Sequence, residues 1–181
     1  SHGHVALEEF NLPMKITAIT HRLKPVIPSY LSQVAPSESS VIKRVAYEPL
    51  FLSHLKNNLS IRGVQKVSLH EPLTGLLRVT IITVEHNTPK TEVWRALYGA
   101  AFFKGDCGKI CIAVNDDIDP DNSDALMWAM AYRMNPVEDV QTLAHRGQGH
   151  GPKRENDGEE DSTLLMDATM KSAMPPLALP T

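Results

Sequence analysis

Alternation of apolar and polar positions predicts strands at several places along the chain. Met14–Thr20 alternates in this way and is rich in β-branched residues, which is typical of a strand. Lys109–Val114 is apolar almost throughout, which favours a buried strand. A pair of strands joined by a turn at Glu71–Gly75, and a short last strand, complete the set: Val64–His70, Leu76–Val84 and Thr163–Asp167.

Helical spacing appears between these strands. Ser37 can cap a helix that begins at Glu38, and Pro49 should interrupt that helix because proline lacks an N–H and clashes with the preceding turn. Thr88-Pro89 is a typical helix start, with a cap residue followed by proline at the first helical position. Strands and helices therefore alternate, which predicts the α/β class, a mixed β-sheet flanked by helices.

A further helix is expected to open at Asn122-Ser123. Its large apolar residues recur at helical spacing, and they should share one side: Leu126, Met127, Met130 and Ala131. The segment Arg146–Asp161 is rich in glycine and charge, so it is predicted to be a loop.

Length and composition limit the classes of function. The chain has 181 residues, enough for one domain with a substantial core. A net charge of −3 argues against a dedicated nucleic-acid binder, and no apolar run is long enough to span a bilayer. No secretory signal is visible, and Cys111 falls inside a predicted strand, where a disulfide with Cys107 is not favoured. We therefore expect a cytoplasmic protein without membrane or nucleic-acid partners.

An acidic turn, Asn115–Asp121, follows one predicted strand. An EF-hand is excluded, since the sixth and twelfth positions from Asp117 are not glycine and glutamate. Asp117 and Asp119 fit a Mg²⁺-dependent phosphatase of the strand–Asp-x-Asp type, in which the first aspartate attacks phosphorus. The favoured interpretation is structural, because carboxylates cap a helix start and short acidic motifs often match by chance.

Ordered motifs along the chain resemble the UbiD family, which are decarboxylases that use prenylated flavin mononucleotide. The resemblance extends from about residue 14 to residue 171 and is carried by these segments: Ile19–Pro25, Val114–Asp119, Asp124–Arg133, Gly149–Pro152 and Leu165–Thr169. It implies a decarboxylase of aromatic or α,β-unsaturated carboxylic acids, and within that enzyme the C-terminal domain, which carries oligomer contacts and closes over the active site.

The chain departs from the family pattern in its catalytic groups. The Glu-Arg-Glu network of the family and its Gly-Pro-aromatic-Gly-Glu motif have no counterpart in residues 1–181. We therefore expect residues 1–13 to be a residual linker from a missing flavin-binding domain. Residues 14–171 would form the oligomerisation and lid domain, and residues 172–181 a truncated tail. No catalytic residue and no metal ligand is assigned to the fragment, which is expected to be inactive alone.

The resemblance also implies site residues. Lys104 would contact the flavin, although a lysine at a helix end is ordinarily just solvated. His145 could donate to a heteroatom on the substrate ring, although a lone loop histidine is more often solvated too. The positions expected to line the substrate pocket are Ile42, Lys43, Cys107, Leu143 and His145.

The same resemblance implies partners. The parent enzyme would use prenylated FMN with a divalent metal and K⁺, whereas the fragment alone is expected to bind none of them. The substrate would be an aromatic carboxylic acid. A homodimer or higher homo-oligomer is expected, because the apolar residues of Leu126–Met134 and the apolar tail would otherwise be exposed.

Overall fold

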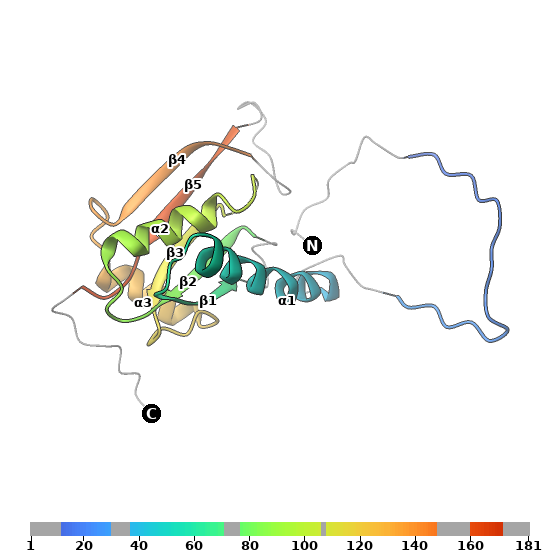
Figure 1. The fold of residues 1–181 in the computed structure, drawn as a ribbon, viewed down its shortest axis with the longest axis horizontal. Helices are drawn as coiled ribbons and strands as arrows, with labels where there is room; N and C mark the ends of the chain where they lie inside the picture. The colour runs from blue at the N-terminus through green and yellow to red at the C-terminus, as the bar shows by residue number, and fades with distance from the viewer. Residues whose placement is uncertain (1–11, 30–36, 71–76, 106–107, 148–159, 172–181) are drawn as a thin grey trace.

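The computed structural model describes residues 12–29, 37–70, 77–105, 108–147 and 160–171. The predicted turn at Glu71–Gly75 lies outside these ranges. The described elements follow one another as shown in Figure 1: helix α1 (Glu38–Ser53), π-helical turn η1 (His54–Asn58), strands β1 (Val64–Leu69) and β2 (Val79–Val84), helix α2 (Lys90–Ala101), strand β3 (Ile110–Asn115), helix α3 (Ser123–Arg133), and strands β4 (Val140–Gly147) and β5 (Glu160–Asp167).

The five strands form one mixed sheet in the order β1-β2-β3-β5-β4. The three central strands β2, β3 and β5 run parallel, whereas β1 and β4 pair antiparallel at the two edges. The sheet therefore confirms the predicted α/β class with a mixed sheet. The parallel strands are connected by helices, as parallel pairing requires.

Helices cover both faces of the sheet. On one face, α1 packs over β1 and α2 packs over β2, β3 and β5, with η1 against α2. Phe51, Leu55 and Leu97 are fully buried in this layer. On the other face, α3 packs over β2 and β3, where Leu126 and Ala129 meet Ile112. Each fully buried side chain of this size contributes about 1.5–3 kcal/mol to stability.

Helix α1 begins where the sequence predicts. The hydroxyl of Ser37 accepts from the Ser40 amide, and the Ser40 hydroxyl in turn accepts from the Ser37 amide, which completes a capping box. The predicted interruption at Pro49 is wrong, because the helix runs through Pro49 to Ser53. The exposed side of the helix accommodates the proline, and the irregularity appears later, as the π-helical turn η1.

Two helices differ from prediction in detail. Helix α2 starts at Lys90, so Pro89 is its N-cap and not its first helical residue, and no side chain caps it. In α3, Leu126 is buried as expected, but Met127 is 61% exposed and Ala131 is exposed. Within the described parts of the chain, every helix falls short of the length and apolar character that a membrane crossing requires.

The predicted strand Met14–Thr20 is wrong. Residues 12–29 have no regular secondary structure and are exposed throughout. Met14 is 83% exposed and Ile19 is 78% exposed, so neither side of the segment is buried. A strand requires a neighbour to complete its hydrogen bonds, and the described sheet has none next to this segment.

Strand β4 is absent from the sequence prediction, and β5 starts earlier than predicted. The start of the predicted loop Arg146–Asp161 is strand, since Arg146 and Gly147 pair with Asp161 and Glu160. Most side chains of β4 are exposed or half-buried, so the strand lacks the alternation that would have indicated it. Residues 148–159 lie outside the described parts.

Candidate functional site

Lys104 lies just after α2, which ends at Ala101 and has Phe102 as its C-cap. Its side chain reaches α1: the ammonium group is 3.3 Å from the hydroxyl of Tyr47 and 5.1 Å from the centre of that ring. Both a hydrogen bond and a cation–π contact thus hold an exposed cation beside an aromatic ring. The lysine predicted to contact a flavin is therefore oriented by α1 and is not simply extended into solvent.

Leu143 and His145 lie on β4, where Leu143 directly precedes a β-bulge and His145 lies within it. Leu143 is half-buried against the core under α2, whereas His145 is exposed. His145 has a φ of 58°, which is uncommon for a non-glycine residue. Its Nδ1 lies 2.6 Å from a carboxylate oxygen of Glu160 on β5. The neighbouring strand therefore orients the imidazole.

Ile42 and Lys43 lie on the exposed side of α1. Ile42 is 55% exposed, and the nearby Val41 and Val45 are 50% and 69% exposed. One helical side therefore carries an apolar strip that the described part of this chain does not cover. Cys107, the remaining predicted pocket residue, lies outside the described residues.

The structure brings some of these positions together. Tyr47 lies one helical turn beyond Lys43 and touches Lys104. The guanidinium of Arg146, next to His145 on β4, lies 3.4 Å from the backbone carbonyl of Lys104. Parts of α1, the end of α2 and the β4 bulge thus meet around Lys104. Tyr47 could have been found from helical spacing, whereas nothing in the sequence indicates Arg146.

Two aspartates of the acidic turn, Asp117 and Asp121, form ion pairs with arginines. Both carboxylate oxygens of Asp117 accept from Arg133, at 3.0 and 2.5 Å, and the Arg133 side chain is almost completely buried. Asp119 accepts from the Asp121 amide, and Asp121 accepts from Arg44 of α1. Asn122, not an aspartate, caps α3 through the amides of its first turn. The turn therefore serves packing between α1, α3 and the sheet.

No arrangement for a metal ion is present in the described residues, where no three His, Cys, Asp or Glu side chains are grouped suitably. An Asp117 carboxylate that already forms a bidentate pair with a buried arginine is poorly placed to attack phosphorus. These observations weigh against the phosphatase alternative.

A buried ionic cluster ties three elements together at the carboxyl edge of the sheet. Asp139, before β4, accepts from Lys90 of α2 at 2.9 Å and from the Asn135 amide. Lys171 lies 3.5 Å from Asp139 and 3.3 Å from Asp167, the last residue of β5. Burial alone would raise the pKa of the Asp139 carboxyl, but the Asn135 amide and the two lysines hold it below its usual value. The hydrogen bond that Lys90 donates to Asp139 raises the pKa of Lys90 in turn.

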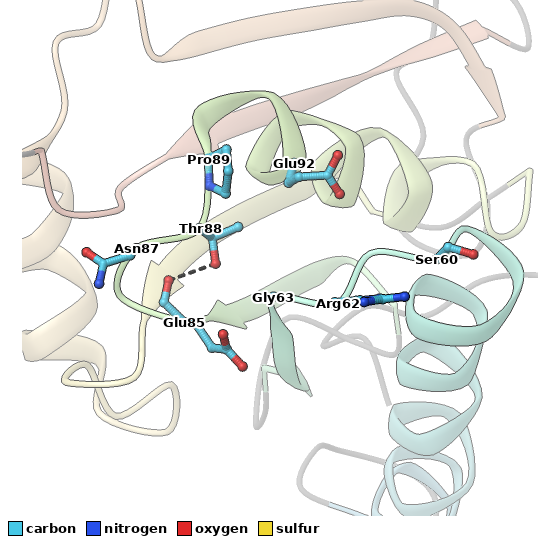
Figure 2. A pocket seen from close by; sticks show the side chains of 8 residues that line it. All are labelled: Ser60, Arg62, Gly63, Glu85, Asn87, Thr88, Pro89 and Glu92. Atoms are coloured by element: carbon cyan, nitrogen blue, oxygen red, sulfur yellow. Dashed lines mark hydrogen bonds between the residues drawn. The ribbon is translucent and has the colours of Figure 1, made fainter.

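A cavity of about 290 Å³ lies between the start of β1 and the start of α2. Its lining includes Arg62 and two carboxylates, those of Glu85 and Glu92. Figure 2 shows that these side chains point in different directions, and Thr88 donates its hydroxyl proton to the carbonyl of Glu85. A binding pocket requires polar groups that converge on one point, and this cavity lacks that convergence.

A shallower and more apolar cavity of about 420 Å³ lies between η1 and α2. Tyr98 and Phe102 line it, together with Gly99. A Cβ atom at Gly99 would lie 2.5 Å from a methyl carbon of Leu59, so glycine leaves room for this leucine to pack against α2. The cavity therefore lies beside a close contact between α2 and the end of η1.

Comparison with known families identifies the fold. The model of the 3-octaprenyl-4-hydroxybenzoate carboxy-lyase C-terminal domain matches residues 41–168, more than two thirds of the chain. The chain belongs to this UbiD family. The match includes most of α1, the acidic turn and the β4 bulge, and it confirms the family predicted from the motifs.

Solved UbiD-class enzymes share the fold. The enzyme HmfF from Pelotomaculum thermopropionicum, in complex with FMN, superposes with a TM-score of 0.65 at 17% identity over 79% of this chain and 32% of its own. The 3,4-dihydroxybenzoic acid decarboxylase of Klebsiella pneumoniae gives a TM-score of 0.64 at 18% identity over 78% and 31% of the two chains. Identities this low establish the fold alone.

A protein of Archaeoglobus fulgidus with no described function is 26% identical over 131 residues, which are 71% of this chain and 26% of that protein. The chain thus spans about a third or less of the length of these proteins. The roles of Lys104 and the predicted pocket residues stay predictions.

Proposed function

We propose that residues 14–171 act as the C-terminal domain of a UbiD-type decarboxylase, which uses prenylated FMN and acts on an aromatic or α,β-unsaturated carboxylic acid. The observation that carries this proposal is the family match, which includes every element that bears a predicted site residue. The solved relatives are decarboxylases of 3,4-dihydroxybenzoic and vanillic acids, and HmfF is described with FMN and with prenylated FMN.

The described residues fit one side of a flavin site. Lys104 offers an exposed cation beside the ring of Tyr47, which suits a phosphate or a flavin carbonyl. A complete phosphate cradle would need further donors, which we assign to a flavin-binding domain outside residues 1–181. When bound, the prenylated flavin supplies the chemistry that breaks the carbon–carbon bond.

In this proposal the chain forms the lid and substrate wall of the pocket. Ile42 and Leu143 exclude water from the apolar part of the substrate, and Lys43 and Cys107 complete the wall. His145 donates a hydrogen bond to a heteroatom on the substrate ring, with Glu160 fixing the imidazole. The proton transfers belong to the flavin-binding domain, because the glutamate and arginine network of the family is not in this sequence.

The proposal also includes self-association as a homodimer or higher homo-oligomer, with one relative described in a dimeric form. The divalent metal and K⁺ belong to the cofactor site of the flavin-binding domain. The tail at residues 172–181 is assigned to contacts with another subunit.

The test compares the chain alone with the chain joined to a flavin-binding domain of the family. With prenylated FMN and a panel of aromatic acids, the chain alone should release no CO₂ above background, whereas the joined protein should turn over. Lys104→Ala should weaken flavin binding of the joined protein by about tenfold, a loss of one charge-assisted contact. Lys56→Ala, at an exposed lysine of η1, is the control and should leave flavin binding unchanged.

Substrate preference provides a second measurement in the joined protein. His145→Ala should alter the relative kcat/KM of acids with and without a polar ring substituent by about tenfold, because one hydrogen bond to the substrate is lost. Flavin binding should be unchanged. Turnover by the chain alone, or an equal loss for all acids, would contradict the assigned roles.

A further inference from the structure

The bulge in β4 reverses the direction of one side chain. Two residues of β4, Ala144 and His145, oppose the single residue Ser162 of β5, because Leu143 pairs with Thr163 and Arg146 pairs with Asp161. In a regular strand, alternation would place Arg146 on the side of the sheet opposite to Leu143. The extra residue inverts this, so Arg146 turns toward α2, on the same side as Leu143.

Arg146 is buried there, with 8% of its surface exposed. Its guanidinium donates to the backbone carbonyl of Ala101, lies 3.4 Å from that of Lys104, and donates to the hydroxyl of Thr163 at 3.2 Å. The same group stacks 4.7 Å from the ring centre of Phe102. One side chain thus contacts the end of α2 and the residues that follow it.

These contacts lie at the C-terminal end of α2, where the helix has no cation of its own. The last turn of α2 contains no basic residue, although its free carbonyls carry partial negative charge. Arg146 supplies this missing cation from another strand. The amides of Phe102 and Phe103 bond back to Tyr98 and Ala100, so the backbone leaving α2 is held on both sides.

We propose that Arg146 is a positioning residue for Lys104. By holding the carbonyls of Ala101 and Lys104, it fixes the backbone from which the Lys104 side chain reaches Tyr47. The bulge that directs Arg146 inward also leaves His145 outside, so one backbone feature orients both residues. The importance of this for catalysis rests on the proposed function, whereas the geometry does not.

The guanidinium is essential to this role. Its planar fork of donors can bond two carbonyls and a hydroxyl at once while its face covers the Phe102 ring. A lysine at the same position keeps the charge, but its three donors sit on a single nitrogen and it has no plane to stack. Arg146→Lys therefore keeps the positive charge and removes the planar group of donors, so it tests which of the two the role requires.

Nuclear magnetic resonance of the full chain tests the proposal. The Lys104 ammonium lies over the Tyr47 ring, so the adjoining ε-methylene protons are expected to carry an upfield ring-current shift, for which Tyr47→Leu defines the complete loss. In Arg146→Lys this shift should fall by more than half, and amide exchange at Phe102 and Phe103 should accelerate about tenfold, as expected for the loss of about one hydrogen bond. Arg95→Lys is the matched control, because Arg95 is an exposed arginine of α2 that also bonds a backbone carbonyl.

The outcomes are distinguishable. Amide exchange in β1, far from Arg146, reports whether the variant is folded, and it should match the wild-type chain. A folded Arg146→Lys chain that retains the full Lys104 shift and the slow exchange would overturn the positioning role. An equal effect in Arg95→Lys would also overturn it. Lys104→Ala without effect on flavin binding would refute the proposed function instead, and would leave the Arg146 result standing.

Discussion

At the scale of single residues, the acidic turn shows how buried charge is used for structure. The Arg133 side chain is 1% exposed, and Asp117 holds its guanidinium through two hydrogen bonds. The guanidinium also lies 5.1 Å from the ring centre of Trp128. An arginine buried so deeply depends on its carboxylate, because an uncompensated charge in the interior is strongly destabilising.

Removing that carboxylate should therefore be costly. Asp117→Asn should lower the free energy of unfolding by about 3 kcal/mol, since Arg133 stays buried without its full countercharge. Asp116→Asn, at the exposed neighbouring carboxylate, should change it by less than about 0.5 kcal/mol. Denaturant unfolding of both variants measures the difference.

Titration calorimetry on the same proteins tests whether Asp117 has a structural role or binds Mg²⁺ for catalysis. Mg²⁺ should bind the wild-type chain no more tightly than the millimolar range, because Asp117 is already paired. A micromolar Mg²⁺ site that disappears in Asp117→Asn would instead support the phosphatase alternative.

The sequence indicated site residues only where a motif or a helical period carried them. Lys104 and His145 came from the family resemblance. Arg146 had no such signal, because strand alternation would have placed it on the opposite side from Leu143. A bulge depends on pairing with β5, which is not visible in the local sequence.

At the scale of elements, the same dependence on neighbours explains which strands were predicted. The buried strands β2 and β3 were found because both of their faces are covered and their sequences are apolar. Met14–Thr20 has the pattern of a strand but no neighbour in the described sheet. Strand β4 has β5 as its neighbour, but its sequence shows little alternation of apolar and polar residues. Local sequence predicts the propensity for a strand, whereas pairing decides whether it forms.

The ionic cluster that joins α2, β4 and β5 should make stability depend on pH. Asp139→Asn should lower the free energy of unfolding by about 2 kcal/mol at pH 7, since a buried carboxylate loses its charged hydrogen bond to Lys90. The pKa of Asp139 is lowered in the folded state, so its contribution is fully present above the unfolded pKa of about 3.9. It is lost as the pH falls through the folded pKa.

The stability difference between wild type and Asp139→Asn should therefore close below about pH 4. Thermal unfolding from pH 3 to pH 8 measures it. Glu138→Gln, at the exposed adjacent position, is the control and should follow the wild-type profile closely. A difference that is constant with pH would show that Asp139 acts through packing and not through its charge.

The proline in the interior of α1, Pro49, can be tested for its effect on stability. Pro49 removes one helical hydrogen bond in the interior of α1, on an exposed side. Pro49→Ala should raise the free energy of unfolding by about 1–3 kcal/mol, the cost of an interior proline less the added freedom of the unfolded chain. Leu50→Ala, at the next and half-exposed position, should change it by less than about 1 kcal/mol. A loss of stability in Pro49→Ala would mean that the proline shapes the entry into η1.

At the scale of the whole molecule, two of the described helices, α1 and α3, carry apolar surfaces that lie uncovered. One is the strip on α1 formed by Val41, Ile42 and Val45, of which the proposed function assigns Ile42 to the substrate pocket. The other lies on α3 and the turn after it, where Met127, Tyr132 and Val137 are 61%, 68% and 89% exposed. Apart from its ends, α3 contains no charged residue, which is unusual for a helix facing water.

The α3 surface should therefore be the one through which copies of this chain associate. Wild-type protein should sediment at more than the monomer mass at low micromolar concentration, and Met127→Glu should shift it toward the monomer, because a charge would have to be buried in the contact. Val45→Glu introduces the same charge on the α1 strip and should leave the association unchanged. Equal dissociation by both variants would assign the contact to α1 or to general solubility, and a wild-type monomer at every concentration would remove self-association from the proposed function.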